Sequence, residues 1–196
     1  MMIYQTVILA IVAYFLGSIS FSYIFTKLRT GKDIRTVGVK NSGALNVFEN
    51  VGKGIGLLAG IADALKAVVV VVIGKLIGLD TFPTIFAASF AVIGHCFPIY
   101  YKFYGGRGAS AALGILLCFI PLEVLISCIP AALIAYCIRR MGFTPVFILG
   151  FSPIVAAIFK KPATIIWGVV YLVLLTGVLN LIINISKRDE KLIPEN

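Results

Sequence analysis

Long apolar stretches recur along this chain, and they constrain its fold more than any other feature. Seven such stretches are separated by polar or proline-containing segments. Only 13% of the residues are charged, whereas 60% are hydrophobic. Most of the surface therefore cannot face water, which excludes a soluble domain, a disordered chain, a coiled coil and a disulfide-stapled secreted protein. The sequence predicts an all-α membrane protein built as a single integral-membrane domain, residues 1–196.

Charge placement decides how many spans this chain has. At roughly 20 residues per crossing, the expected spans are residues 3–26, 54–78, 82–97, 109–120, 122–138, 143–159 and 163–184. Pro121 and Glu123 interrupt 109–138, which forms either two helices or one kinked helix. Two helices place thirteen Lys and Arg residues on one side of the membrane and three on the other, whereas one helix gives ten against six. The positive-inside rule favours two helices. We therefore expect seven transmembrane helices, the N-terminus outside and the C-terminus in the cytoplasm.

One of these spans is short. Residues 109–120 would reach only about 18 Å as a helix, less than the roughly 30 Å of the hydrocarbon core. Irregular backbone at membrane depth persists only where protein or a water-filled cavity covers it. We therefore expect the preceding polar segment, 98–108, to line a cytoplasmic pocket.

A long polar loop, residues 31–46, follows the first span. It concentrates three cations, two amides and three glycines, namely Lys32, Arg35, Lys40, Asn41, Asn46, Gly31, Gly38 and Gly43. Backbone N–H groups together with cations form anion-binding sites. A solvated, positively charged cytoplasmic loop explains the same composition, so composition alone leaves both interpretations open.

A second polar segment ends in Gly105-Gly106-Arg107-Gly108 and leads directly into a helix. Glycines let backbone amides approach a phosphate, the helix N-terminus adds partial positive charge, and arginine binds phosphate bidentately. His95, the only histidine of the chain, lies just before this segment, near the end of the preceding span. That histidine is either a packed residue or a catalytic or ligand-binding one.

Asp63 and Lys66 lie three residues apart inside a span, on one helical face. Burying either charge is costly, so we expect them to pair and to point towards the polar loops. The four cysteines, at positions 96, 118, 128 and 137, lack metal-type spacing. We interpret them as reduced packing residues and expect neither a metal nor a cofactor.

Together these stretches resemble the bacterial membrane-integral acyl-phosphate:glycerol-3-phosphate acyltransferases, the PlsY family. The matching blocks are Gly17-Ser18, Asp33-Ile34-Arg35, Gly38, Asn41, Gly43-Ala44, Asn46, Asp63, Lys66, Gly94-His95, Phe97-Pro98 and Gly105-Gly106-Arg107-Gly108. The resemblance implies seven spans in the bacterial inner membrane and an active site facing the cytoplasm. It implies transfer of a fatty acyl group from acyl phosphate to the 1-hydroxyl of glycerol 3-phosphate. The products would be lysophosphatidic acid and phosphate.

The chain departs from the family pattern in and just after the first loop and in the second motif. It also departs in a third motif, reduced to Arg140 with Gly142-Phe143-Thr144-Pro145, and before the C-terminal tail, where apolar Leu181-Ile182-Ile183 precedes Asn184. Val39 replaces a serine, Lys40 a glycine, Leu45 a threonine and Glu49 an arginine, while Arg107 replaces a lysine. Losing a hydroxyl and reversing a charge are expected to weaken phosphate binding in the first loop.

The resulting hypothesis assigns the catalytic roles to His95, Arg107 and Asn41. It assigns phosphate or substrate binding to Arg35, Lys40, Gly43, Asn46, Gly105, Gly106 and Gly108. The glycine turn with Arg107 would hold one phosphate, and Asn41 with the loop cations the other. His95 would orient or deprotonate the attacking hydroxyl, and no covalent acyl-enzyme is needed because acyl phosphate is already activated.

The expected partners are acyl phosphate, glycerol 3-phosphate or another phosphorylated acceptor, and membrane lipids. The net charge of +9 is explained by the positive-inside bias, so no nucleic-acid partner is expected. Two alternatives stay open. One is a divergent family member with an altered acceptor or lost catalysis that binds an acyl phosphate or an anionic lipid. The other is a small anion channel or transporter, which the absence of an evident internal repeat disfavours.

Overall fold

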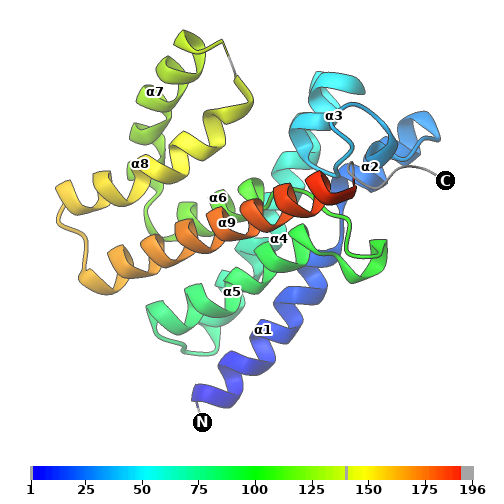
Figure 1. Ribbon diagram of the computed structural model, residues 1–196. Helices are drawn as coiled ribbons and strands as arrows, with labels where there is room; N and C mark the ends of the chain where they lie inside the picture. The colour runs from blue at the N-terminus through cyan, green and yellow to red at the C-terminus, as the bar shows by residue number, and fades with distance from the viewer. Residues whose placement is uncertain (1, 140, 191–196) are drawn as a thin grey trace.

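The computed structural model describes residues 2–139 and 141–190, and within them the chain is helical without β-strands (Figure 1). The α-helices are α1 (Met2–Ser18), α2 (Phe21–Thr30), α3 (Ala44–Asn50), α4 (Lys53–Leu76), α5 (Thr81–Cys96), α6 (Ala109–Phe119), α7 (Pro121–Cys137), α8 (Thr144–Ile158) and α9 (Ala163–Glu190). Short 3-10 turns are η1 (Ile34–Thr36), η2 (Ile99–Tyr101) and η3 (Met141–Phe143).

The prediction of an all-helical membrane protein is confirmed. Four helical segments are long and apolar enough to cross a membrane: Met2–Thr30, Lys53–Leu76, Thr81–Tyr101 and Ala163–Ser186. Three shorter apolar helices, α6, α7 and α8, accompany them. Many large apolar side chains on these helices are exposed at the protein surface, as expected for helices that face lipid rather than water.

Residues 109–137 form two helices, as the charge distribution favoured. The backbone leaves the helical conformation at Ile120 (φ −138°), and Pro121 starts α7. Proline fits the first turn of a helix because its missing N–H has no intrahelical partner there. α6 has 11 residues and is about 17 Å long; it packs on α4, whereas α7 packs mainly on α8.

The first predicted span, 3–26, lies within the apolar helical segment Met2–Thr30, but this segment consists of two helices rather than one. α1 ends at Ser18, and α2 begins at Phe21 with Ser20 as its N-cap, whose Oγ accepts from the Tyr23 amide at 3.2 Å. The Lys66 ammonium of α4 donates to the carbonyls of Gly17 and Ile19, both at 2.7 Å. The apolar run concealed this break because the polar group that stabilises it lies on another helix.

Two further differences concern the polar segments. The loop after α2 contains a seven-residue helix, α3, within a region expected to lack regular structure. α3 packs closely on α4, and a Cβ added at Gly56 would clash with the backbone of Phe48. At the other end of the chain, α9 continues past the predicted boundary at 184 to Glu190.

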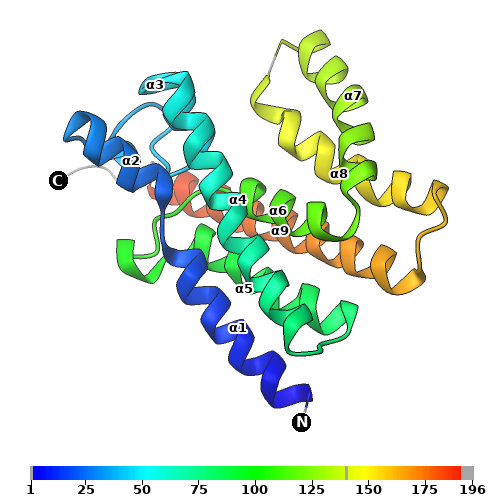
Figure 2. The same ribbon diagram turned by 180° about the vertical axis from the view of Figure 1, so that it is seen from behind.

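Small residues bring α1 and α5 into close contact along their length, as both views show (Figures 1 and 2). A Cβ added at Gly94 would overlap the carbonyl of Tyr14, and one at Gly17 would overlap the carbonyl of Ala91. Glycine at such positions lets helix backbones approach closely enough for extensive van der Waals contact. This packing places the end of α5, which carries His95, beside the end of α1.

The polar connections gather at one end of the molecule. In Figures 1 and 2, α2, α3 and the last turns of α9 lie together, away from the start of α1 and from the α4–α5 and α8–α9 connections. Cations at that opposite region have local partners. Lys75 Nζ donates to the carbonyl of Cys118 at 3.1 Å, and Lys161 Nζ lies 3.2 Å from a carboxylate oxygen of the buried Glu123.

Replacing Gly94 with Ala should destabilise the protein, because α1 must move away from α5 to accept the new methyl group. We expect a clear fall in the thermal unfolding midpoint in detergent, measured by intrinsic fluorescence. Gly150→Ala is the matched control, since a Cβ at Gly150 meets no atom within 4 Å. Equal midpoints for the two variants would contradict the packing described for α1 and α5.

Candidate active site

The loop after α2 is organised around the side chain of Asn46, which is 1% exposed. Its Nδ2 donates to three carbonyls, those of Ile34 (3.2 Å), Val37 (3.0 Å) and Asn41 (2.8 Å). Its Oδ1 accepts from the Val39 amide at 3.2 Å. A side-chain amide has only two N–H groups, so Asn46 has none left for a ligand. Asn46 thus shapes the loop in this structure, and its phosphate contact stays a prediction.

Asn41 and Gly43 form a local turn within this loop. The Asn41 Oδ1 accepts from the Gly43 amide at 3.1 Å, the usual arrangement of an Asx turn. Gly43 then precedes α3 as its N-cap. The amide of Gly43 is thus engaged within the loop, whereas Asn41 lines the pocket described below.

Arg35 connects the first loop to the second. Its guanidinium forms a short ion pair with Asp33 (2.6 Å), donates to the Tyr101 carbonyl (2.9 Å) and lies against the rings of Tyr23 and Tyr101. The hydrogen-bonded guanidinium lowers the pKa of Asp33, and the carboxylate in turn raises the pKa of Arg35. The pair therefore stabilises the loop at neutral pH. That contribution is lost only in acid, as pH falls below the ordinary Asp pKa of about 3.9 and through the lowered value.

The two polar loops are in direct contact. The Ser42 amide donates to the Gly105 carbonyl at 3.3 Å, and a pocket of about 210 Å³ opens beside this contact. The polar part of its wall contains Arg35, Lys40, Asn41 and Lys102. The apolar part includes Phe97, Phe103, Tyr104 and Ile183. A pocket with three cations next to aromatic and aliphatic side chains suits an anionic head group attached to an apolar chain.

The glycine turn before α6 is packed tightly against the end of α5. Side chains at Gly105 or Gly106 would overlap the backbone or ring of His95, and one at Gly108 would overlap Val92. Gly108 adopts a left-handed conformation (φ +77°) as the N-cap of α6. The Gly106 amide donates to the His95 carbonyl at 3.0 Å, and its use in a phosphate cradle stays a prediction. Of the three glycines, Gly105 lines the pocket.

Arg107 turns towards α9 rather than onto the pocket wall. Its Nη2 donates to the Asn184 Oδ1 at 3.3 Å, and its carbonyl accepts from the Asn180 Nδ2 at 2.9 Å. These two asparagines were not predicted as site residues. The signal that could have found them is their spacing of four residues, which places two amides on one face of an otherwise apolar span.

His95 belongs to a buried polar cluster with Asp63 and Lys66. Lys66 Nζ lies 2.8 Å from the Asp63 Oδ1 and 3.1 Å from the His95 Nδ1. The pairing predicted for Asp63 and Lys66 is confirmed, and the cluster also receives a weak hydrogen bond from Ser22 to Asp63 at 3.4 Å. His95 is 5% exposed, and its other ring nitrogen, Nε2, faces Gly106. The ring therefore lies directly beneath the glycine turn, whereas the neighbouring Cys96 and Phe97 line the pocket.

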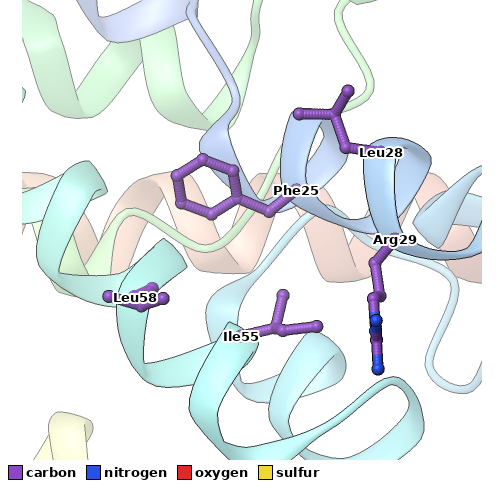
Figure 3. Close-up of a pocket in the computed structure, with 5 residues that line it drawn as sticks. All are labelled: Phe25, Leu28, Arg29, Ile55 and Leu58. Atoms are coloured by element: carbon purple, nitrogen blue, oxygen red, sulfur yellow. The ribbon is translucent and has the colours of Figure 1, made fainter.

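A second hollow lies between α2 and α4, away from these residues (Figure 3). It has a volume of about 300 Å³ and is lined by Phe25, Leu28, Arg29, Ile55 and Leu58. The wall is apolar except for Arg29, and none of the residues predicted for the site contributes to it. The residues predicted for the site therefore gather at the loop junction and not in this apolar hollow.

The fold and the site define a helical membrane protein with a pocket at one end of its bundle, where cations adjoin apolar side chains. A family model described as glycerol-3-phosphate acyltransferase matches residues 7–190. Among similar proteins, the glycerol-3-phosphate acyltransferase of Syntrophomonas wolfei is 36% identical over 158 residues, covering 81% of this chain and 80% of the relative. That of Clostridioides difficile is 36% identical over 171 residues, covering 85% and 84%.

Solved structures point to the same family. The crystal structure of PlsY, an integral membrane glycerol 3-phosphate acyltransferase, in its glycerol 3-phosphate form superimposes with a TM-score of 0.80 at 28% identity. The alignment covers 95% of this chain and 93% of that chain. Its lysophosphatidic acid form gives a TM-score of 0.77 at 26% identity. The chain belongs to the PlsY family of glycerol-3-phosphate acyltransferases.

Replacing Arg35 with Lys should loosen the loop junction although it keeps the positive charge. A lysine cannot bridge Asp33 and the Tyr101 carbonyl while stacking on two tyrosine rings. We expect a loss of about 1 to 2 kcal/mol in local stability, seen as faster amide hydrogen exchange in residues 33–46. Lys32→Arg, at an exposed neighbouring position, is the control. Unchanged exchange in Arg35→Lys would show that this contact does not hold the loop.

Proposed function

We propose that this protein transfers a fatty acyl group from acyl phosphate to the 1-hydroxyl of glycerol 3-phosphate. The observation that supports this most directly is the junction of the two loops, where cations and apolar side chains share one pocket. Both substrates carry phosphate, and one of them also carries an apolar chain. The pocket offers charge for the phosphates and an apolar wall for the chain. Homologues named for this activity and PlsY structures with glycerol 3-phosphate and lysophosphatidic acid support the same assignment.

The reaction needs charge and placement more than a protein nucleophile. The acceptor hydroxyl attacks the acyl carbon, the bond between that carbon and the phosphate oxygen breaks, and inorganic phosphate leaves. Holding two anionic groups together accounts for much of the rate enhancement available to such a transfer. We assign Lys40, Asn41 and Lys102 to the phosphates in the pocket, and Arg107 to a substrate group between the glycine turn and α9. His95 acts on the substrates through its ring, which packs against Gly106 of the glycine turn.

We further propose seven membrane crossings in the bacterial inner membrane, the N-terminus outside, and the active site facing the cytoplasm. The four long and three shorter apolar helices of the described residues support this count. The clustering of cation-rich loops at one end supports the orientation, because cytoplasmic loops carry an excess of Lys and Arg. A cytoplasmic site would also give direct access to water-soluble glycerol 3-phosphate.

A phosphate-release assay tests the function. Purified protein incubated with acyl phosphate should release phosphate only when glycerol 3-phosphate is added, and lysophosphatidic acid should form in equal amount. Arg107→Ala should reduce turnover at least a hundredfold while the protein stays monodisperse in detergent. Arg29→Ala, at the apolar hollow, is the matched control and should keep wild-type turnover. Full activity in Arg107→Ala would remove that residue from the site, and acceptor-independent release would contradict the proposed acceptor.

A divergent member with an altered acceptor is the second candidate, and the first loop motivates it. Val39 is 59% exposed at a position where the family pattern has serine. Restoring the hydroxyl with Val39→Ser should raise kcat/KM for glycerol 3-phosphate by about tenfold, the effect of roughly one hydrogen bond to a charged group. Val39→Ala is the control without a hydroxyl. Equal kcat/KM in both variants, together with faster turnover of another hydroxyl compound, would favour the altered acceptor.

A further inference from the structure

The ammonium of Lys66 has more neighbours than it has protons. Its Nζ lies 2.7 Å from the Gly17 carbonyl, 2.7 Å from the Ile19 carbonyl, 2.8 Å from the Asp63 Oδ1 and 3.1 Å from the His95 Nδ1. Three oxygen acceptors at these distances require three N–H groups, which only the charged form of lysine possesses. Lys66 is therefore an ammonium, and its charge is balanced by Asp63.

This arrangement determines which nitrogen of His95 carries a proton. A proton on Nδ1 would point at a cation 3.1 Å away. The Asp63 Oδ1, the nearby carboxylate oxygen, is 3.6 Å from Nδ1, beyond hydrogen-bonding distance. A lone pair on Nδ1 instead faces the ammonium favourably and shares one of its protons in a three-centre bond. The neutral ring then carries its proton on Nε2, since one ring nitrogen of neutral histidine is a donor and the other an acceptor.

We propose that Lys66 and Asp63 are positioning residues that hold His95 as the Nε2–H tautomer. The buried pair orients the ring from one side, and Gly106 leaves room for Nε2 on the other, where any side chain would overlap the ring. His95 therefore presents a hydrogen-bond donor, and not a base, to the glycine turn. The tautomer follows from the cluster alone, whereas its use on a substrate oxygen rests on the proposed acyltransferase function.

This assignment selects between the two roles predicted for His95. With Nε2 protonated, the ring cannot remove the proton of the attacking hydroxyl. It can donate to an oxygen of the bound substrates, stabilising charge that develops there. The new ester bond forms as the acyl–phosphate bond breaks, and the hydroxyl proton passes to a phosphate oxygen rather than to the ring.

The single histidine of the chain makes the tautomer directly measurable. Protein labelled with ¹⁵N histidine and purified without a histidine tag gives one pair of ring nitrogens in a long-range ¹H–¹⁵N correlation spectrum. At neutral pH we expect an unprotonated Nδ1 and a protonated Nε2. A protonated Nδ1, or a doubly protonated ring, would overturn the proposal whether or not the protein shows acyltransferase activity. Failure of the activity assay with the expected spectrum would instead reject only the proposed function.

Variants test the positioning role. Lys66→Met removes the ammonium, and Lys75→Met on the same helix is the control because Lys75 donates to the distant Cys118 carbonyl. In Lys66→Met we expect signal from the Nδ1–H tautomer and a fall in kcat of at least tenfold, with the KM for glycerol 3-phosphate changed less than twofold. In Lys75→Met the spectrum should be unchanged. An unchanged tautomer in a folded Lys66→Met protein would contradict the proposal.

Substitution of His95 itself distinguishes donor from base even if Lys66→Met does not fold. Glutamine places an amide N–H near the position of Nε2–H but cannot act as a base. A donor role therefore predicts that His95→Gln retains at least tenfold more activity than His95→Ala. Equal loss of activity in these two variants would argue for the base and against the proposed tautomer's role.

Discussion

A buried ammonium group joins three helices of this protein. Lys66 of α4 satisfies the terminal carbonyls of α1, pairs with Asp63 and contacts His95 at the end of α5. An unpaired charge or carbonyl in a membrane interior costs several kcal/mol. Burial of Lys66 therefore requires Asp63 and the two carbonyls as partners, and their burial requires Lys66. Because the cation stabilises the end of α1, the chain can break there and continue as α2. That break leads the first polar loop into position above the glycine turn.

The site results from backbone geometry as much as from charged side chains. Asn46 holds the first loop by its carbonyls, and Arg35 attaches it to Tyr101 of the second loop. The direct bond between Ser42 and Gly105 closes the junction. These contacts bring Lys40 and Lys102 onto the same pocket wall as Arg35, which is paired with Asp33. The excess of positive charge on this wall is expected to favour binding of a phosphate.

Hydropathy and charge predicted the apolar helices well, because membrane solvation acts on every residue of a span. The helix break at Pro121 could also be predicted, because proline is tolerated in the first turn of a helix but rarely in its interior. Interactions between residues far apart in the sequence were harder to predict. The break before α2 depends on Lys66, 47 residues away from Ile19, and no local pattern indicates it.

The difference between local patterns and contacts of distant residues also explains how the site predictions compare with the structure. Among the residues predicted for the site, Arg35, Lys40, Asn41 and Gly105 line one pocket. The carbonyl contacts of Asn46 could not be predicted, because an asparagine that binds a phosphate and one that binds carbonyls look alike in a sequence. The direction of Arg107 could not be predicted without the position of α9, whose amides it contacts.

The most direct test of the account is an experimental structure of this protein with glycerol 3-phosphate bound. The account predicts phosphate density at the loop junction, within hydrogen-bonding distance of Lys40 or Asn41 and beside Gly105, with the glycerol directed towards the turn that covers His95. Density for the ligand in the hollow between α2 and α4, or at the end of the bundle that carries Lys75, would contradict it.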